Sequence, residues 1–124
     1  MTLKELSQKE DLIFVGGFAM NMHRLKETYG DVDVVVTNLN GIVDYIEYKT
    51  DSAFSSTGKR AFINSNPKVD IFIENSLPEF ELIDGYKVQT IKSMIEYYER
   101  IYPLVKEYWK PHIKNKLKIL KWTG

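Results

Sequence analysis

Three aspartates and a pair of glycines are the residues whose types and spacing could do chemistry in this chain. Asp31 and Asp33 flank one valine in an apolar run, and Gly16-Gly17 ends another apolar run shortly before them. A β-strand alternates its side chains between two faces, so Asp31 and Asp33 would leave the same face, roughly 6–7 Å apart. Two carboxylates held in this way repel each other unless a cation lies between them. Mg²⁺ suits the position because it prefers hard oxygen ligands and leaves room for water and phosphate.

A third carboxylate, Asp70, lies within the apolar run 69–73. An acid in such a run is usually either paired or functional. Asp70 could therefore join the metal site, or it could form an ion pair with Lys59, Arg60 or Lys68. The sequence leaves both interpretations open.

The glycine pair predicts a turn from a strand into a helix. Free amides at a helix N-terminus favour an anion, and glycine lets a phosphate approach the backbone. Gly16 and Gly17 could therefore hold phosphate, or they could form a tight turn without a ligand. The basic residues that could contact phosphate, or lie at the surface without a ligand, are Lys59, Arg60, His23 and Arg24.

The composition is that of an ordinary globular domain. The chain has 124 residues, of which 44% are hydrophobic and 27% charged, and it has no cysteine, which excludes disulfides and cysteine-bearing metal sites. We expect a single domain over 1–124, with a core at about 12–90 and trailing helices at about 90–122. No apolar stretch is long enough to span a membrane, and the first residues do not form a signal peptide. We therefore expect a cytoplasmic protein with no membrane partner.

The net charge of zero conceals a basic C-terminal end. Residues 100–124 contain seven Lys or Arg and one acid. A stripe of lysines on the final helix could bind nucleic acid, with Tyr108, Trp109 and Trp122 stacking on bases. The alternative is an amphipathic helix with a solvated lysine face. The lysines of the stripe are Lys110, Lys114, Lys118 and Lys121.

Periodicity and turn signals predict the elements that must position these residues. The expected strands are 12–15, 31–37, 53–56, 60–64, 68–74, 80–82 and 86–88, the last two forming a hairpin across Asp84-Gly85. Five helices are expected. The first runs from Leu3 to about Lys9 with a Thr2–Glu5 capping box, and the second from the glycine pair to Tyr29-Gly30. The third is capped by Asn38 or Asn40, with Ile42, Val43 and Ile46 facing inward, the fourth is capped by Thr90 and interrupted by Pro103, and the fifth starts near Pro111.

Together these parts resemble the nucleotidyltransferase superfamily of the DNA polymerase β type, especially its small single-domain bacterial and phage members. The family pattern is an apolar strand ending in Gly-Gly or Gly-Ser, a helix, an Asp-x-Asp strand and a third acid in a later strand. The matching segments here are 14–23, 31–36 and 68–73, within a resemblance that covers 12–74. The expected fold is α/β (α+β): a mixed, twisted β-sheet with helices packed against it and a helical C-terminal tail.

The resemblance implies Mg²⁺-dependent transfer of a nucleoside monophosphate from an NTP, with ATP the expected nucleotide, to a hydroxyl of RNA, of a protein or of a small molecule. Two Mg²⁺ ions would hold the triphosphate and lower the pKa of the attacking hydroxyl. The implied catalytic and metal-binding residues are Asp31, Asp33 and Asp70, and the implied nucleotide-binding residues are Gly16 and Gly17, to which Lys59 and Arg60 could add positive charge.

Two other classes of function stay open. Small members of this superfamily serve as antitoxins paired with a helical toxin, so the chain could be a non-catalytic binding module for a helical partner protein. A homodimer could likewise supply acceptor recognition. The third class is a nucleic-acid binder that uses the basic C-terminal helix alone, for which binding would depend steeply on salt and not on Mg²⁺ or NTP.

Overall fold

The computed structural model describes residues 1–122, which form a seven-stranded mixed β-sheet and four α-helices. The helices are α1 (Leu3–Ser7), α2 (Gly16–Met22), α3 (Ile91–Ile101) and α4 (Lys110–Trp122), with short 3-10 turns at Tyr102–Leu104 and Glu107–Trp109. The strands are β1 (Leu12–Val15), β2 (Val32–Val36), β3 (Tyr45–Lys49), β4 (Lys59–Ile63), β5 (Val69–Ile73), β6 (Phe80–Ile83) and β7 (Tyr86–Gln89). The expected α/β class, the mixed sheet and the C-terminal helix are confirmed.

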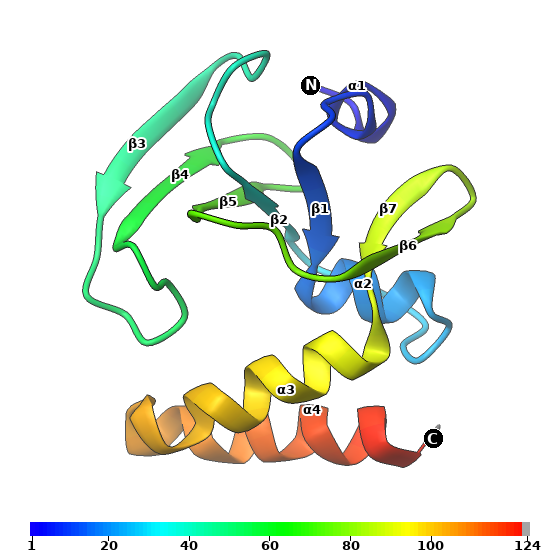
Figure 1. The fold of residues 1–124 in the computed structure, drawn as a ribbon, viewed down its shortest axis with the longest axis vertical. Helices are drawn as coiled ribbons and strands as arrows, with labels where there is room; N and C mark the ends of the chain where they lie inside the picture. The colour runs from blue at the N-terminus through cyan, green and yellow to red at the C-terminus, as the bar shows by residue number, and fades with distance from the viewer. Residues whose placement is uncertain (123–124) are drawn as a thin grey trace.

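Strand β2 lies at the centre of the sheet. The strand order is β3-β4-β5-β2-β1-β7-β6, so β2 has β5 on one side and β1 on the other (Figure 1). β2 runs parallel to β5 and antiparallel to β1, whereas β1 runs parallel to β7. The strand that carries Asp33 therefore contacts both the strand that carries Asp70 and the strand that leads into the glycine pair.

One face of the sheet is apolar and buried. Because side chains alternate along a strand, Val32, Val34 and Val36 share one face, and all three are fully buried. They pack with residues of the neighbouring strands, of α1 and of the segment after β2, including Leu6, Phe14, Ile42, Ala61, Val69 and Ile71. The opposite face of β2 and β5 therefore carries Asp33 and Asp70.

Helices α3 and α4 form an antiparallel hairpin below the sheet in Figure 1. The Thr90 hydroxyl accepts a hydrogen bond from the Ser93 amide at 3.1 Å, which confirms the predicted N-cap. The hairpin packs on α2 and β7 through a second apolar cluster of Ala19, Met20, Val88, Met94, Tyr98, Ile101, Val105, Ile113 and Leu120. None of the helices within residues 1–122 has the length and apolarity needed to cross a membrane.

Two local predictions from turn and cap chemistry are confirmed. Thr2 and Glu5 form the expected capping box at the start of α1, which ends slightly earlier than predicted. Asp84 and Gly85 connect β6 to β7 with φ values of 51° and 85°, as a type I′ hairpin turn requires.

Two predicted elements are wrong. The helix expected after Asn38 or Asn40 is absent, and its second half is strand β3, which pairs with β4 along its whole length. The pattern Tyr-Ile-Glu-Tyr has strong strand propensity, and pairing with a neighbouring strand stabilises the strand over the helix. The strand expected at 53–56 is instead part of the loop between β3 and β4, where Phe54 packs on Trp109 with ring centroids 5.2 Å apart.

Helix α2 ends earlier than predicted, at Met22 instead of Tyr29-Gly30. Arg24 adopts a left-handed conformation with φ of 63°, and the Leu25 amide donates to the Met20 carbonyl at 2.9 Å. This arrangement is a Schellman-type ending, which turns the chain away from the helix axis. The segment 25–31 therefore passes beside α2 and delivers the chain to β2.

Asp11 joins the start of β1 to the end of β2. Its carboxylate accepts hydrogen bonds from the Thr37 amide and hydroxyl and lies 2.7 Å from Lys9 Nζ. Partial burial raises the pKa of Asp11, but these hydrogen bonds outweigh burial and lower it to about 2. The carboxylate therefore stabilises the fold above about pH 4, and this contribution is lost as the pH falls toward 2.

We expect Asp11→Ala to lower the free energy of unfolding by roughly 1–2 kcal/mol at pH 7, because it leaves the Thr37 groups without their acceptor. Urea denaturation at pH 7, 4 and 2.5 would measure the difference from the unmodified protein, which should shrink as the pH falls. Glu10→Ala, at an exposed position next to Asp11, is the control. Equal losses in the two variants would contradict this role of Asp11.

Candidate functional site

Asp33 and Asp70 lie directly opposite each other. They occupy paired positions on the parallel strands β2 and β5, so their side chains leave the same face of the sheet as neighbours. Both are largely shielded from solvent, with the side chain of Asp70 only 14% exposed. Residues that are distant in sequence thus form a close pair of carboxylates.

The surroundings of Asp33 favour its protonated form. Burial raises its pKa to about 6, and the nearby charges of Asp70 and Asp31 act in the same direction, whereas Lys116 and Arg60 act in the opposite one. Since this pKa exceeds the unfolded value, the ionised group destabilises the fold at neutral pH. Lys116 and Arg60 offset only part of the effect of burial and of the neighbouring carboxylates on Asp33.

The glycine pair packs against Asp33. Gly16 has φ of 64°, and a Cβ added to it would lie 2.3 Å from Asp33 Oδ2. Only glycine fits this position without displacing the carboxylate. A Cβ on Gly17 would lie 3.8 Å from Lys26 Nζ, so a lysine ammonium covers the second glycine. The structure thus brings the predicted phosphate turn next to the acid pair.

Of Lys59 and Arg60, the two basic residues predicted to add positive charge, the structure brings Arg60 to this face. Arg60 pairs with Phe72 on β5 and Tyr48 on β3, and its Cζ lies 4.1 Å and 5.5 Å from the centroids of those two rings. Its Nε is buried and has no hydrogen-bond partner in the part of the chain described. Lys59 is the preceding strand residue, so alternation places it on the opposite face.

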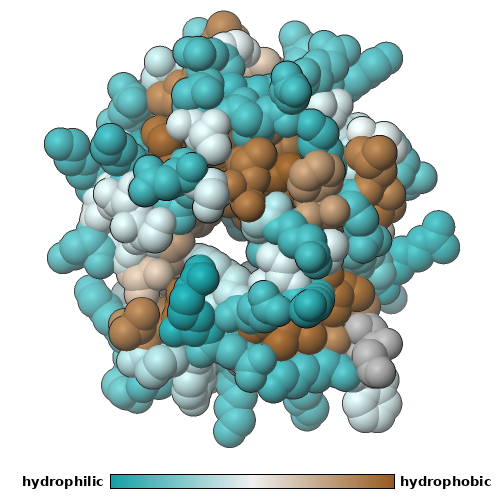
Figure 2. All heavy atoms as spheres, in the orientation of Figure 1, coloured by the Kyte–Doolittle hydropathy of each residue, from teal (hydrophilic) through white to brown (hydrophobic). Residues whose placement is uncertain are grey.

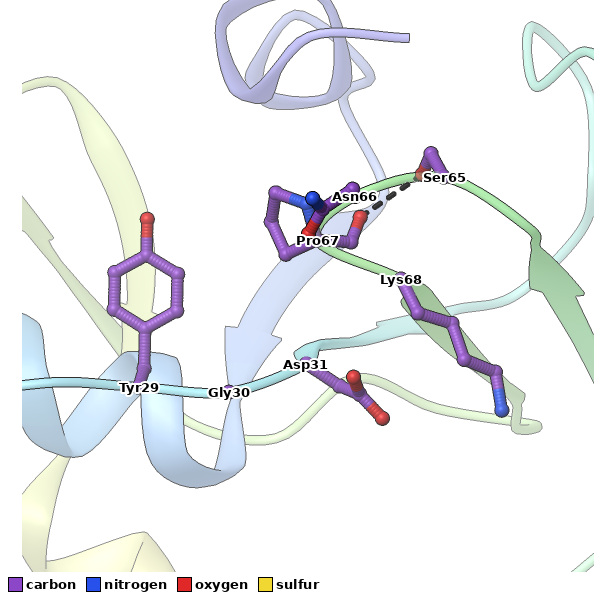
Figure 3. Close-up of a pocket in the computed structure, with 7 residues that line it drawn as sticks. All are labelled: Tyr29, Gly30, Asp31, Ser65, Asn66, Pro67 and Lys68. Carbon is purple, nitrogen blue, oxygen red and sulfur yellow. Dashed lines mark hydrogen bonds between the residues drawn. The ribbon is translucent and has the colours of Figure 1, made fainter.

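Asp31 lies one residue before β2, exposed and on the side of Asp33. Figure 3 shows its carboxylate and the Lys68 ammonium extending to the same side of a surface pocket whose other walls are 29–30 and 65–67. Lys68 Nζ also lies 3.3 Å from Asp70 Oδ1, so Asp70 forms one of the ion pairs considered for it and also lies opposite Asp33.

The three acids do not form a complete metal cage by themselves. Within residues 1–122, no group of three or more carboxylate or histidine side chains is placed to enclose a metal ion. The oxygen donors of Asp33 and Asp70 do fit a divalent cation, because a cation would relieve the repulsion between them. The three-acid site therefore stays a prediction, with Asp33 and Asp70 at its centre.

The two basic residues that follow the glycines end α2, one in a contact with β7 and one at the surface. His23 Nε2 lies 2.8 Å from the Gln89 carbonyl oxygen, so this side chain ties α2 to β7. Arg24 is exposed at the left-handed position that ends α2. Of the two alternatives considered for them, the surface and packing role describes both.

Two lysines, one beside the glycine turn and one near Asp33, had no predicted role. Lys26 reaches Gly17 because α2 ends early and the Asn21 side-chain amide donates to the Lys26 carbonyl at 3.0 Å. Lys116 is half-buried on α4, with Nζ 5.3 Å from the Tyr98 ring centroid. The signal for Lys116 was its spacing, three residues after Ile113 and four before Leu120, which places it on the apolar side of the helix.

A hollow separates the face of the sheet that carries Asp33 and Asp70 from the helical hairpin. Figure 2 shows the molecule hollowed at its centre, and Figure 1 places this region between the sheet and α3–α4. The charge of Asp33 affects the pKa of Tyr98 on α3 and of Lys116 on α4, so Asp33 faces the hairpin. The loop between β3 and β4 bridges the two parts, since Tyr97 Oη donates to the Phe54 carbonyl at 2.7 Å.

Asp33→Asn removes a charge that the fold accommodates poorly. We expect it to raise the free energy of unfolding by roughly 2–3 kcal/mol at pH 7. The gain should shrink to a few tenths of a kcal/mol at about pH 3.5, where Asp33 is protonated in the folded state and mostly protonated in the unfolded state. Urea denaturation across this pH range gives the measurement, with Asp84→Asn in the exposed β6–β7 turn as the matched control. A gain that persists undiminished at about pH 3.5 would show that another effect is responsible.

Gly16→Ala tests the contact between the glycine turn and Asp33. Gly41 has φ of 84°, and nothing lies within 4 Å of a Cβ added to it, so Gly41→Ala carries the backbone strain without the clash. We expect both variants to lose about 1 kcal/mol of unfolding free energy, and Gly16→Ala to lose roughly 1–3 kcal/mol more. Equal losses on denaturation would mean that the Asp33 carboxylate moves aside freely.

Comparisons of the chain with protein-family models, with curated proteins and with solved structures found no match. The function is therefore inferred from the residues of the chain and their arrangement. The central features are a carboxylate pair on neighbouring parallel strands, a glycine turn packed against it, and the cationic side chains of Lys68, Arg60 and Lys116 near the acids.

Proposed function

We propose that this protein is a nucleotidyltransferase, which transfers a nucleoside monophosphate from an NTP to an acceptor hydroxyl. The single observation that carries the proposal is the paired placement of Asp33 and Asp70 beside Gly16. A largely buried pair of like charges lowers the stability of the fold. Binding of a divalent cation with its phosphate ligand would relieve this repulsion, so a binding role explains why the pair is present.

In this proposal Asp33 and Asp70 hold the metal, and Asp31 adds a ligand from the exposed end of β2. Mg²⁺, when bound, neutralises phosphate charge and lowers the pKa of the acceptor hydroxyl. Asp33 and Asp70 are thus positioned to bind the same ion together. The side-chain charges of the acids and of the surrounding cations suit a bound NTP–Mg²⁺ complex.

The chain's own residues position the nucleotide and the proton. Gly16 and Gly17 let the phosphates approach the backbone, and the Arg60 guanidinium offers a buried Nε without a partner among the described residues. The acceptor oxygen attacks the α-phosphorus, the bond from that phosphorus to the bridging oxygen breaks, and pyrophosphate leaves. Asp70, held by Lys68, accepts the hydroxyl proton. Positioning and charge neutralisation supply most of the rate enhancement.

The structure gives less support to the alternatives. On the basic stripe of α4, Lys110 pairs with Glu107 at 3.2 Å and Lys121 pairs with Glu99 at 3.3 Å, which leaves fewer charges for a nucleic-acid backbone. Trp109 packs on Phe54, whereas Tyr108 and Trp122 are exposed. A pure binding module would have no use for a buried pair of carboxylates.

Transfer can be measured with each NTP labelled at the α-phosphate, in the presence of Mg²⁺ or Mn²⁺, total RNA and cell lysate. Label on RNA, on a protein or on a small molecule identifies the class of acceptor. We expect Asp33→Asn and Asp70→Asn to reduce incorporation by at least about 100-fold, because each removes a carboxylate that would hold the metal ion at the reacting phosphates.

Asp84→Asn provides the matched control for this experiment, since it makes the same substitution in an exposed turn. It should retain full activity, and the site variants should remain folded by circular dichroism. Full metal-dependent transfer by Asp33→Asn would falsify the proposed function.

A further inference from the structure

Strand β3 forms one edge of the sheet, and its outer side is open (Figure 1). Within residues 1–122 it pairs with β4 alone. Three large apolar side chains at this edge are exposed, Val43 at 54%, Tyr45 at 37% and Ile46 at 56%. Proteins usually protect such an edge with proline, a bulge, a covering segment or charged side chains. β3 has only the last of these, and its two charges, Glu47 and Lys49, are of opposite sign.

The hydrogen-bonding pattern of β3 shows which backbone groups face the open edge. Bonded and non-bonded residue pairs alternate along two antiparallel strands. One position beyond the end of β3, the Thr50 amide donates to the Gly58 carbonyl at 2.8 Å. Because every second residue bonds to the same neighbour, Tyr48 also bonds to β4. The backbone N–H and C=O groups of Glu47 and Lys49 therefore point outward.

Lys49 has a like charge beside it and no counter-charge. The register of β3 on β4 places it directly opposite Lys59, and like charges in this position repel each other. Neither lysine forms an ion pair within residues 1–122. Glu47 lies on the same face of β3, is exposed, and is likewise without an ion pair in the described part of the chain. An acid on the open side of Lys49 would relieve the repulsion.

A second copy of the same edge supplies that acid. Antiparallel pairing about a two-fold axis at Tyr48 sets Glu47 of each copy opposite Lys49 of the other. The backbone groups of both residues already point outward, so each facing pair exchanges both of its hydrogen bonds. An axis at Glu47 would set two carboxylates opposite each other, and an axis at Ile46 would set Glu47 opposite Tyr45. The charges therefore select the axis at Tyr48.

The other edge of the sheet lacks this self-complementarity. β6 has Glu81 as its only charged residue, so no register of two β6 strands sets opposite charges against each other. Pro78 also lies two residues before β6, where it limits extension of the strand. Charge complementarity thus favours β3 as the edge that pairs, and a second β3 as its partner.

We infer that β3 joins two copies of this chain into a dimer with one continuous sheet. Strand pairing puts Tyr48 directly opposite Arg60, on the face of the sheet that carries Asp33 and Asp70. Tyr48 of the second copy extends that face beyond the Arg60 guanidinium. The inference does not depend on the proposed function, because the charges that carry it lie outside the metal and nucleotide sites proposed above.

Sedimentation at increasing protein concentration and low ionic strength measures the dimer. We expect Glu47→Lys to weaken dimerisation by roughly tenfold or more, because two attractive pairs become repulsive. The double variant Glu47→Lys/Lys49→Glu exchanges the charges within each copy and should restore dimerisation to within about threefold of the unmodified protein. Glu81→Lys on β6 is the matched control and should leave the dimer unchanged.

Thermal unfolding verifies that all of these variants are folded. A monomer at every concentration of the unmodified protein would mean that the edge does not serve a second copy, and would overturn the inference. A dimer that Glu47→Lys leaves intact, or one that the double variant does not restore, would overturn it as well.

A cysteine at position 48 tests the axis independently, because the chain has no cysteine of its own. At the axis the two Tyr48 residues form a non-bonded pair with Cα atoms about 4.5 Å apart, a separation that a disulfide spans. We expect Tyr48→Cys to give a disulfide-linked dimer on mild oxidation, and Leu82→Cys, at an exposed position on β6, to stay monomeric. Failure of Tyr48→Cys to crosslink, or equal crosslinking of Leu82→Cys, would contradict the proposed interface.

Discussion

The register of β2 on β5 is the constraint on which the candidate site depends, because it sets Asp33 and Asp70 opposite each other. The apolar residues on the opposite face of the same strands fix that register. A slip of one residue would move Val32, Val34 and Val36 out of the core and carry Asp33 into it. The buried valines therefore hold the two carboxylates together, and apolar packing on one face offsets the electrostatic strain on the other.

The cations around this pair come from separate elements. Lys68 directly precedes β5, Arg60 belongs to β4, and Lys116 belongs to α4. No single sequence motif contains them, and Lys116 comes near Asp33 because the helical hairpin packs below the sheet. The trailing helices are thus more than a cover for the sheet, since one of them contributes a charge to the centre of the molecule.

The sequence predicted the features that depend on neighbours along the chain. The capping box at Thr2, the turn at Asp84-Gly85 and the strand containing Asp33 are determined locally, and all three are confirmed. Strand β3 was missed because its conformation depends on pairing with β4, and the end of α2 was missed because Arg24 occupies a left-handed position that sequence rarely reveals.

The candidate site was predictable to a similar degree. Strand alternation predicted which residues of β2 share a face, and the same rule applied to β4 would have separated Lys59 from Arg60. The role of Lys116 was not predicted, because its residue type does not distinguish it from the other lysines of the same basic helix. Its spacing from Ile113 and Leu120 was the available signal, but its proximity to Asp33 follows only from tertiary packing.

The hollow is bounded by anchored segments. Phe54, in the loop between β3 and β4, is fastened to the hairpin by the Trp109 ring and the Tyr97 hydroxyl, and α2 contributes to both apolar clusters at another boundary. These contacts fix the sheet and the hairpin relative to each other. Most of the conformational entropy of assembling the cleft is therefore lost during folding, and a molecule that bound there would pay less of this cost out of its own affinity.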